Sequence, residues 1–144
     1  MKILILTQHF FPENFRFNDL ALGLLADGNE VSVLTGIPNY PGGDFFSSYK
    51  PLSPAKEYWN GLKIYRAPLM PRKQNKIMLA LKYISFPMMA TIMLMMIISK
   101  HKFDRIIVCQ SSPIFMAIPA AIVRRFRKIP VYLWITDLWP ESLR

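Results

Sequence analysis

The sequence predicts an α/β fold of the Rossmann-like type, with a parallel sheet and helices on both of its faces. Short, nearly continuous apolar runs suit strands that are covered on both sides, and they alternate with longer segments of helical spacing. Strands that alternate with helices are typical of a doubly wound sheet. With 144 residues, 52% of them hydrophobic, the chain suits a single domain spanning residues 1–144.

The apolar runs predict five strands, at residues 2–6, 31–35, 62–66, 105–109 and 131–135. The first helix is expected to be capped by Asn18 or Asp19 and to stop at Gly28. Two further helices are expected at residues 76–99 and 113–128, the second with Pro113 in its first turn. A long irregular loop is expected at residues 36–60, and such loops are often functional.

Polar segments rich in proline and aromatic residues follow four of the five expected strands. Because ligands bind outside the carboxyl ends of parallel strands, these segments are expected to converge on one site. The candidate residues are Gln8, His9, Glu13, Asn39, Tyr40, Ser111, Ser112, Asp137, Trp139 and Glu141.

Several of these residues have a structural interpretation as well as a functional one. Asp137 could cap a helix, or it could orient an acceptor hydroxyl in a reaction, and Glu13 has the same two interpretations. His9 could be an ordinary loop residue or part of the site. Ser111 and Ser112 suit a helix N-terminus, which also presents free N–H groups to an anion.

The sequence disfavours several kinds of cofactor site. There is no GxGxxG after the first strand and no P-loop, which argues against dinucleotide and NTP sites. One cysteine and two histidines are too few for a structural zinc site, so no metal is expected. The single cysteine fits a reducing compartment, and no signal peptide is visible, so we expect a cytoplasmic location.

The charge and the most apolar segment point to a phosphate-bearing or membrane partner. The net charge is +9, and only Asp104 is acidic between Tyr58 and Thr136. Residues 84–98 are almost wholly apolar and contain Pro87, so they suit either a buried crossover helix or a helix lying in the plane of a membrane. Basic residues before this segment would face an anionic membrane: Arg72, Lys73, Lys76 and Lys82.

Three motifs resemble those of a known family. HFFPENFRFNDLA at residues 9–21, GIPNYPGG at residues 36–43 and DLWPES at residues 137–142 are similar to motifs in bacterial GT-B glycosyltransferases of family 4. The resemblance is to the N-terminal domain, particularly that of the fucosamine transferases of O-antigen and capsule assembly.

The resemblance implies a retaining transfer of a sugar from a nucleotide-sugar, such as a UDP-sugar, without a metal. The acceptor in such enzymes is often an undecaprenyl-diphosphate-linked glycan, which places the enzyme on the inner face of the cytoplasmic membrane. Residues 8–13 would approach the donor phosphates and the acceptor. Asp137 falls where many relatives carry a His-Asp pair, and because Thr136 replaces that histidine, Asp137 is the candidate catalytic residue. The C-terminal domain that holds most donor contacts is not in this chain, so we expect weak donor binding by this chain alone.

Two other classes of function are alternatives to sugar transfer. A nucleotide-sugar epimerase is disfavoured by the missing GxGxxG. A basic, membrane-associated binding module without catalytic activity remains the alternative, whereas no nucleic-acid-binding motif is present.

Overall fold

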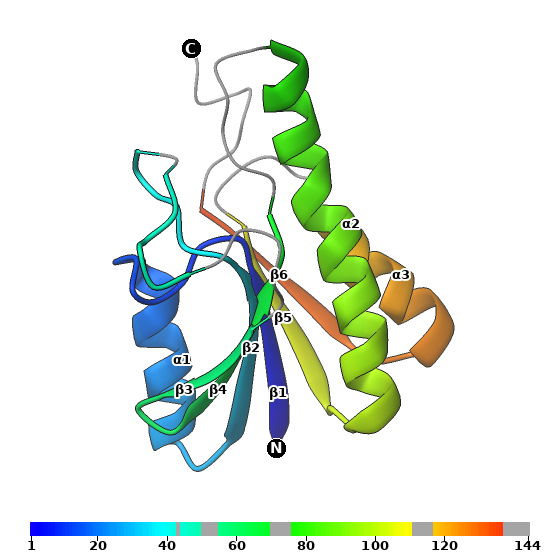
Figure 1. Ribbon diagram of the computed structural model, residues 1–144. Helices are drawn as coiled ribbons and strands as arrows, with labels where there is room; N and C mark the ends of the chain where they lie inside the picture. Colours follow the sequence, from blue (N-terminus) through cyan, green and yellow to red (C-terminus); the bar gives the residue numbers. More distant parts are fainter. Residues whose placement is uncertain (43, 50–54, 70–75, 111–116, 137–144) are drawn as a thin grey trace.

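The computed structural model describes residues 1–42, 44–49, 55–69, 76–110 and 117–136, with the backbone alone for residues 76–83. This part of the chain forms a Rossmann-like α/β domain with one six-stranded sheet (Figure 1). Its elements are β1 (Lys2–Thr7), α1 (Arg16–Ala26), β2 (Glu30–Gly36), β3 (Ala55–Trp59), β4 (Leu62–Ala67), α2 (Lys76–Lys100), β5 (Arg105–Gln110), α3 (Ile118–Arg127) and β6 (Val131–Ile135).

The strands lie in the order β3-β4-β2-β1-β5-β6. All neighbouring pairs are parallel except β3 and β4, which form an antiparallel hairpin. The prediction of an irregular loop throughout residues 36–60 was therefore wrong over β3. Asn60 and Gly61 both have positive φ, and an Asn-Gly pair of this kind is a strong signal for a two-residue hairpin turn.

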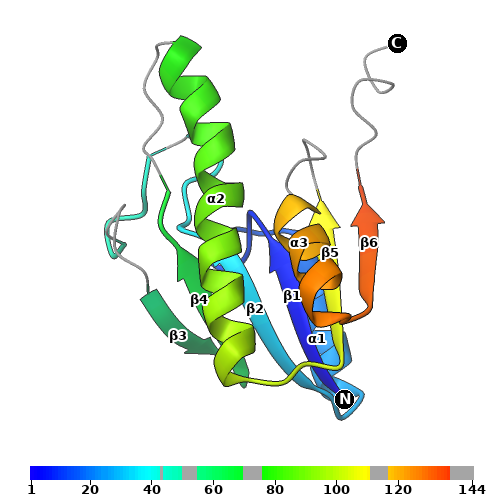
Figure 2. The ribbon, with the colours of Figure 1, turned by 90° about the vertical axis from the view of Figure 1, so that its right-hand side faces the viewer.

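Helices cover both faces of the sheet, as predicted. α1 lies on one face, whereas α2 and α3 lie side by side on the other (Figures 1 and 2). Alternate residues of β1 point to the two layers, with Ile5 in the core beneath α1 and Leu4 and Leu6 in the core beneath α2 and α3. The central strands are thus buried on both sides, which explains their uninterrupted apolar sequence.

α1 begins earlier than expected, at Arg16, and no side chain caps it. The prediction that Asn18 or Asp19 would be the cap was wrong. Asn18 lies within the first turn, and its side-chain amide donates to the carbonyl of Glu13 at 2.8 Å, so it ties the helix to the preceding loop. The expected helix end is confirmed, because Gly28 has a φ of +81° just beyond the C-cap Asp27.

The described part of α3 begins at Ile118 and ends at Arg127, with Lys128 in the left-handed conformation beyond it. Ser111, Ser112 and Pro113 lie outside the described residues, so the proposed start of this helix is not tested. Arg124, Arg125 and Arg127 lie in the last turn of α3, where their positive charges complement the helix dipole.

α2 is 25 residues long and continues through Pro87. From Ile84 onward, one face is buried in the core, whereas the opposite face leaves a row of apolar side chains exposed. The segment is therefore a crossover helix with an exposed apolar face, and the contact of that face with a membrane stays a prediction. Within the described chain, no helix is both long enough and apolar enough to cross a membrane.

The close approach between β2 and the loops around it gives a test of the fold. A Cβ added to Gly36 would lie 2.7 Å from Cδ1 of Leu69 and 2.9 Å from the carbonyl oxygen of Gln8. We predict that Gly36→Ala lowers the free energy of unfolding by about 1–3 kcal/mol in urea denaturation, because the backbone carbonyl cannot move aside.

The matched control is Gly23→Ala, on the exposed side of α1 where an added Cβ meets nothing within 4 Å. Removing a glycine from a helix interior should raise the free energy of unfolding by up to about 1 kcal/mol. A neutral effect of Gly36→Ala would contradict the tight contact.

Candidate functional site

The strand order places a topological switch point at the carboxyl ends of β1 and β5. These two strands are neighbours, but the chain leaves β1 for α1 on one face and leaves β5 for α3 on the other (Figure 2). Such a reversal is the place where open α/β sheets bind ligands. Gln8 follows β1 and Gln110 ends β5, so both lie at this switch point.

Glu13 organises the loops at this edge. Its side chain is 1% exposed, and its Oε1 accepts hydrogen bonds from the backbone N–H groups of Asn39 and Tyr40 at 2.8 and 2.7 Å. Its Oε2 accepts from the N–H of Phe10 at 3.3 Å and lies 3.0 Å from Nδ1 of His9. One carboxylate therefore joins the loop after β1 to the loop after β2.

These contacts keep Glu13 ionised despite its burial. Burial by itself raises the pKa of the carboxyl, but the hydrogen bond and charge of His9 and the backbone N–H donors of Asn39 and Tyr40 outweigh it. The net effect lowers the pKa of Glu13 below its ordinary value of 4.5.

Arg66 is the positive counterpart on the other side of the same loop. Its side chain is fully buried, and its guanidinium donates to the carbonyl oxygens of Phe11 and Gly36 and to the carboxylate of Glu57. The ring of Tyr49 lies 5.3 Å from the guanidinium carbon, and the Tyr49 hydroxyl donates to Glu57 at 3.0 Å. Arg66 was not among the residues predicted from the sequence. An arginine within a largely apolar strand is nevertheless a signal, because a charged side chain is rarely buried unless it is paired.

His9 is packed among aromatic rings. Its imidazole stacks on Phe15 with ring centroids 5.2 Å apart and meets the edge of Tyr40 at 5.5 Å. The side chain of His9 is 14% exposed, and Tyr40 is 53% exposed. The two predicted site residues are therefore in contact at the rim of the loops.

Three buried amide atoms near this edge have no hydrogen-bond partner within the described chain: Oδ1 of Asn18, Nδ2 of Asn39 and Oε1 of Gln110. Asn18 and Asn39 both bind Glu13 through other atoms, and Gln110 lies one residue beyond the β5 position that pairs with Thr7 of β1. An unpaired buried polar atom costs about 1–3 kcal/mol. Because unsatisfied buried polar groups are rare in proteins, these three atoms mark this edge as a candidate functional site.

The structure brings together five of the predicted residues, namely Gln8, His9, Glu13, Asn39 and Tyr40. The carbonyl oxygen of Gln8 accepts from Thr35 Oγ1 at 3.2 Å and from the N–H of Gly36 at 3.1 Å, so the backbone of Gln8 is tied to the end of β2. The other predicted site residues lie outside the described part: Ser111, Ser112, Asp137, Trp139 and Glu141. Thr136, just before Asp137, donates from its N–H and hydroxyl to the carbonyl of Gln110, which holds the end of β6 at the same edge.

The described residues hold neither a metal cluster nor a reactive thiol. In this part of the chain, no three or more His, Cys, Asp or Glu side chains are grouped so that they could hold a metal ion. Cys109 is buried, and burial raises the pKa of its thiol to about 12, which keeps it protonated near neutral pH.

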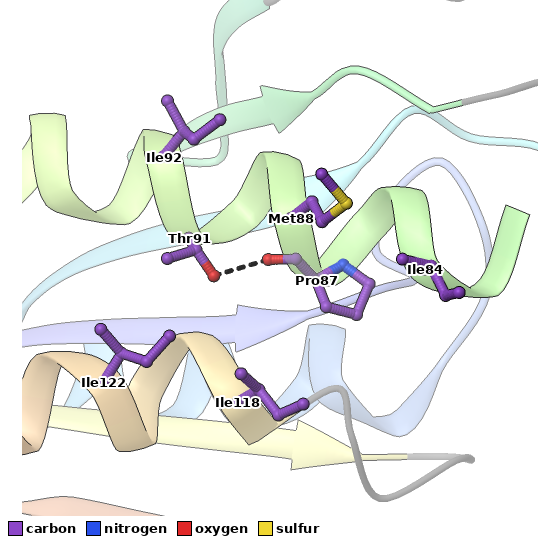
Figure 3. Close-up of a pocket in the computed structure, with 7 residues that line it drawn as sticks. All are labelled: Ile84, Pro87, Met88, Thr91, Ile92, Ile118 and Ile122. Carbon is purple, nitrogen blue, oxygen red and sulfur yellow. Dashed lines mark hydrogen bonds between the residues drawn. The ribbon is translucent and has the colours of Figure 1, made fainter. Parts of the chain in front are cut away.

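A separate apolar groove runs between α2 and α3, with a volume of about 460 Å³. α2 contributes Ile84, Pro87, Met88, Thr91 and Ile92, and α3 contributes Ile118 and Ile122 (Figure 3). Among the described lining residues only Thr91 carries a hydroxyl, which donates to the carbonyl of Pro87 at 2.6 Å and is therefore satisfied within the helix.

The apolar surface continues beyond the groove. Exposed side chains recur every four residues along α2, at Ile84, Met88, Ile92 and Met96, and Lys100 follows at the next position. Arg125 lies one turn after Ile122 on α3 and is also exposed. The side chains of Arg72, Lys73, Lys76 and Lys82, predicted to face a membrane, lie outside the described part.

Comparisons with known proteins bear on the fold alone. No protein-family model matches this chain, and no curated protein matches it. Among solved structures, it is similar to the C-terminal domain, residues 78–226, of a hydrogenase from Pyrococcus furiosus. The TM-score is 0.55 and the sequence identity 14%, over 95% of this chain and 90% of that one. This likeness supports a Rossmann-like α/β fold.

The role of Glu13 as the organiser of two loops predicts a pH-dependent stability. Since its pKa is lower in the folded chain, Glu13 stabilises the fold above the unfolded pKa of about 4.5, and this contribution is lost as pH falls through the folded value. Glu13→Gln, which sets an NH₂ group against backbone donors, should lower the free energy of unfolding at pH 7 by roughly 1–3 kcal/mol.

The measurement is urea denaturation between pH 7 and pH 3, where the variant should lose less stability on acidification than the wild type. Glu30→Gln is the control, because the Glu30 side chain is 67% exposed and pairs only at the surface with Lys2. Equal acid sensitivity of wild type and Glu13→Gln would refute the assignment.

Proposed function

We propose that this chain is the acceptor-binding half of a retaining glycosyltransferase. The enzyme moves a sugar from a nucleotide-sugar to a lipid-linked glycan in the synthesis of a cell-surface polysaccharide. The observation that carries this proposal is the group of unpaired buried amides beside the Glu13-bound loops, at the sheet edge where ligands bind.

The chemistry of this edge suits the hydroxyl groups of a sugar. The unpaired atoms comprise one donor, on Asn39, and two acceptors, on Asn18 and Gln110, and a hydroxyl can satisfy either kind. Aromatic rings at the rim add apolar contact area for a sugar ring, as with the exposed Tyr40. The buried cation of this region, Arg66, is fully engaged by carbonyl and carboxylate oxygens, so the described residues favour a neutral group here over a phosphate.

The donor would be held mainly by a second domain, as the family resemblance implies. Asp137 lies two positions beyond the end of β6, and β6 ends at the same edge as β1 and β5. That position suits a carboxylate which orients the acceptor or stabilises developing charge during transfer.

A second function, attachment to an anionic membrane, is favoured by the groove between α2 and α3. The exposed apolar row ends at Lys100, and Arg125 adjoins Ile122, so apolar and basic side chains share one surface. This combination suits a helix that rests in the membrane interface. α3 is the next described helix after β5, and its N-terminal end lies toward the carboxyl ends of the strands (Figure 2), so this surface would bring the site close to a lipid-linked acceptor. Membrane binding without catalysis remains the alternative function.

The transfer reaction can be tested on the full-length gene product that contains this chain. A panel of UDP-sugars with a polyprenyl-diphosphate-linked sugar should give label in the lipid fraction. Asp137→Ala should lower this transfer about 100-fold or more, because a group that positions or polarises the acceptor is removed.

Asp27→Ala serves as the matched control, since Asp27 follows α1 at the opposite end of the sheet. Transfer that survives Asp137→Ala would assign Asp137 to helix capping. Absence of transfer by the wild type from any donor would leave membrane binding as the supported function.

Membrane attachment is tested by flotation with vesicles of phosphatidylglycerol and phosphatidylethanolamine at low salt. We predict that the chain floats, and that the double change Met88→Glu and Ile92→Glu lowers the bound fraction about tenfold or more, because two charges enter the apolar surface. Tyr58→Glu is the control, because Tyr58 is 69% exposed on β3 at the far edge of the sheet. Failure of the wild type to float would rule out the surface.

A further inference from the structure

The strand β6 forms an edge of the sheet that no other part of the described chain covers. It is the last strand on its side of the sheet, next to β5 (Figure 2). Its residues from Tyr132 to Ile135 all carry large apolar or aromatic side chains, yet they are between 37 and 51% exposed. Strands of parallel sheets are normally buried on both faces, so an exposed strand of this composition indicates an interaction surface.

The opposite edge of the sheet shows how a free edge is protected. β3 carries Lys56 and Glu57, and charged side chains on an edge strand discourage its pairing with another chain. β6 has the sequence VYLWI, which contains no charged residue, no glycine and no proline. The difference indicates that β3 is built as a free edge, whereas β6 is built to be paired.

The backbone of β6 shows what kind of partner can cover this edge. The N–H of Ile106 donates to the carbonyl of Pro130, and the N–H of Thr136 donates to that of Gln110, both at 3.0 Å. Even-numbered residues therefore direct their backbone groups to β5, and odd-numbered residues direct theirs to the open side: Val131, Leu133 and Ile135. Lipid cannot satisfy these N–H and C=O groups, and water leaves the apolar side chains exposed. Both needs are met by another strand that is apolar on both faces, and β6 is itself such a strand.

We propose that β6 pairs antiparallel with β6 of a second copy of this chain. With the two-fold axis at Leu133, Val131 of one copy lies opposite Ile135 of the other, and Tyr132 lies opposite Trp134. Every position then meets an apolar or aromatic side chain, and aromatic cross-strand pairs stabilise a sheet. A two-fold interface has to be self-complementary in this way.

The pairing continues the apolar layers on both faces of the sheet. Val131 packs against the core beneath α2 and α3, and Ile135 shares its face. Trp134 contacts Phe17 with ring centroids 5.7 Å apart, so Trp134 and Tyr132 lie on the α1 face. A notch of about 490 Å³ lies between the end of α3 and the start of β6, where the register brings Ile135 of the second copy.

The charges at the end of α3 favour the antiparallel direction. Arg124 and Lys128 line the notch, and Arg125 and Arg127 lie in the same turn. Parallel pairing would set these cations beside those of the second copy. In the antiparallel register the starts of the two strands lie about 13 Å apart, which exceeds the screening length of about 8 Å at physiological ionic strength.

Analytical ultracentrifugation of the 144-residue chain tests the proposal, and the wild type should be a dimer. Leu133→Lys should raise the dissociation constant about 100-fold or more, because two like charges would face each other across the axis. Leu133→Glu should do the same, whereas a mixture of the two variants should form a mixed dimer. Tyr58→Lys, which adds the same charge to the edge strand β3, is the control and should leave the dimer intact. Circular dichroism checks the fold of each variant.

Amide hydrogen exchange provides a second measurement that needs no variant. The N–H groups of Tyr132 and Trp134 point to β5 and should be protected in monomer and dimer alike. Those of Leu133 and Ile135 point to the open side and should become protected only as the dimer forms.

A monomeric wild type would overturn the proposal, as would a dimer in which the N–H groups of Leu133 and Ile135 exchange freely. A dimer that survives both Leu133 variants would place the interface elsewhere. Protection of these N–H groups that requires anionic vesicles would assign β6 to the membrane and not to a second copy. None of these outcomes depends on sugar transfer, so the proposed function stands or fails separately.

Discussion

The backbone polar groups of the loops at the carboxyl edge must be satisfied without help from the sheet, and two buried charges meet this need. The Glu13 carboxylate binds the N–H groups of Phe10, Asn39 and Tyr40. On the other side, the Arg66 guanidinium binds the carbonyl oxygens of Phe11 and Gly36. A buried charge is tolerated only when it is fully paired, so these loops and the two side chains depend on one another.

This arrangement leaves a defined set of groups free to act. The two charged side chains are occupied by hydrogen bonds, most of them to the backbone. In contrast, Nε2 of His9 and one amide atom each of Asn18, Asn39 and Gln110 have no hydrogen-bond partner within the described chain. Binding sites typically present a few unpaired polar groups on a rigid framework, because a preorganised site loses less conformational entropy when a ligand binds. Under the proposed function, this site would bind the hydroxyl groups of the acceptor, and the apolar groove between α2 and α3 would bind the hydrocarbon part of its lipid.

The candidate site was predicted only in part, for a physical reason. The rule that ligands bind at the carboxyl ends of parallel strands selected the loops that contain His9, Glu13 and Asn39. It could not assign their roles, because the same sequence allows Glu13 to contact a ligand or to hold the backbone. Arg66 was missed because it lies within an apolar strand and its partners come from β2, β3 and the loop after β1.

The sequence by itself determined the class of fold and the positions of most strands and helices, because the spacing of apolar residues indicates which faces of a strand or helix are buried. It also held the Asn60-Gly61 signal for the β3–β4 hairpin, since a two-residue turn is a local property. Only the tertiary structure decided the start of α1, the exposure of one face of α2 and the pairing of His9 with Glu13. Each of these depends on how segments far apart in the chain share hydrogen bonds or bury one another. The spacing of residues within one segment does not identify such partners.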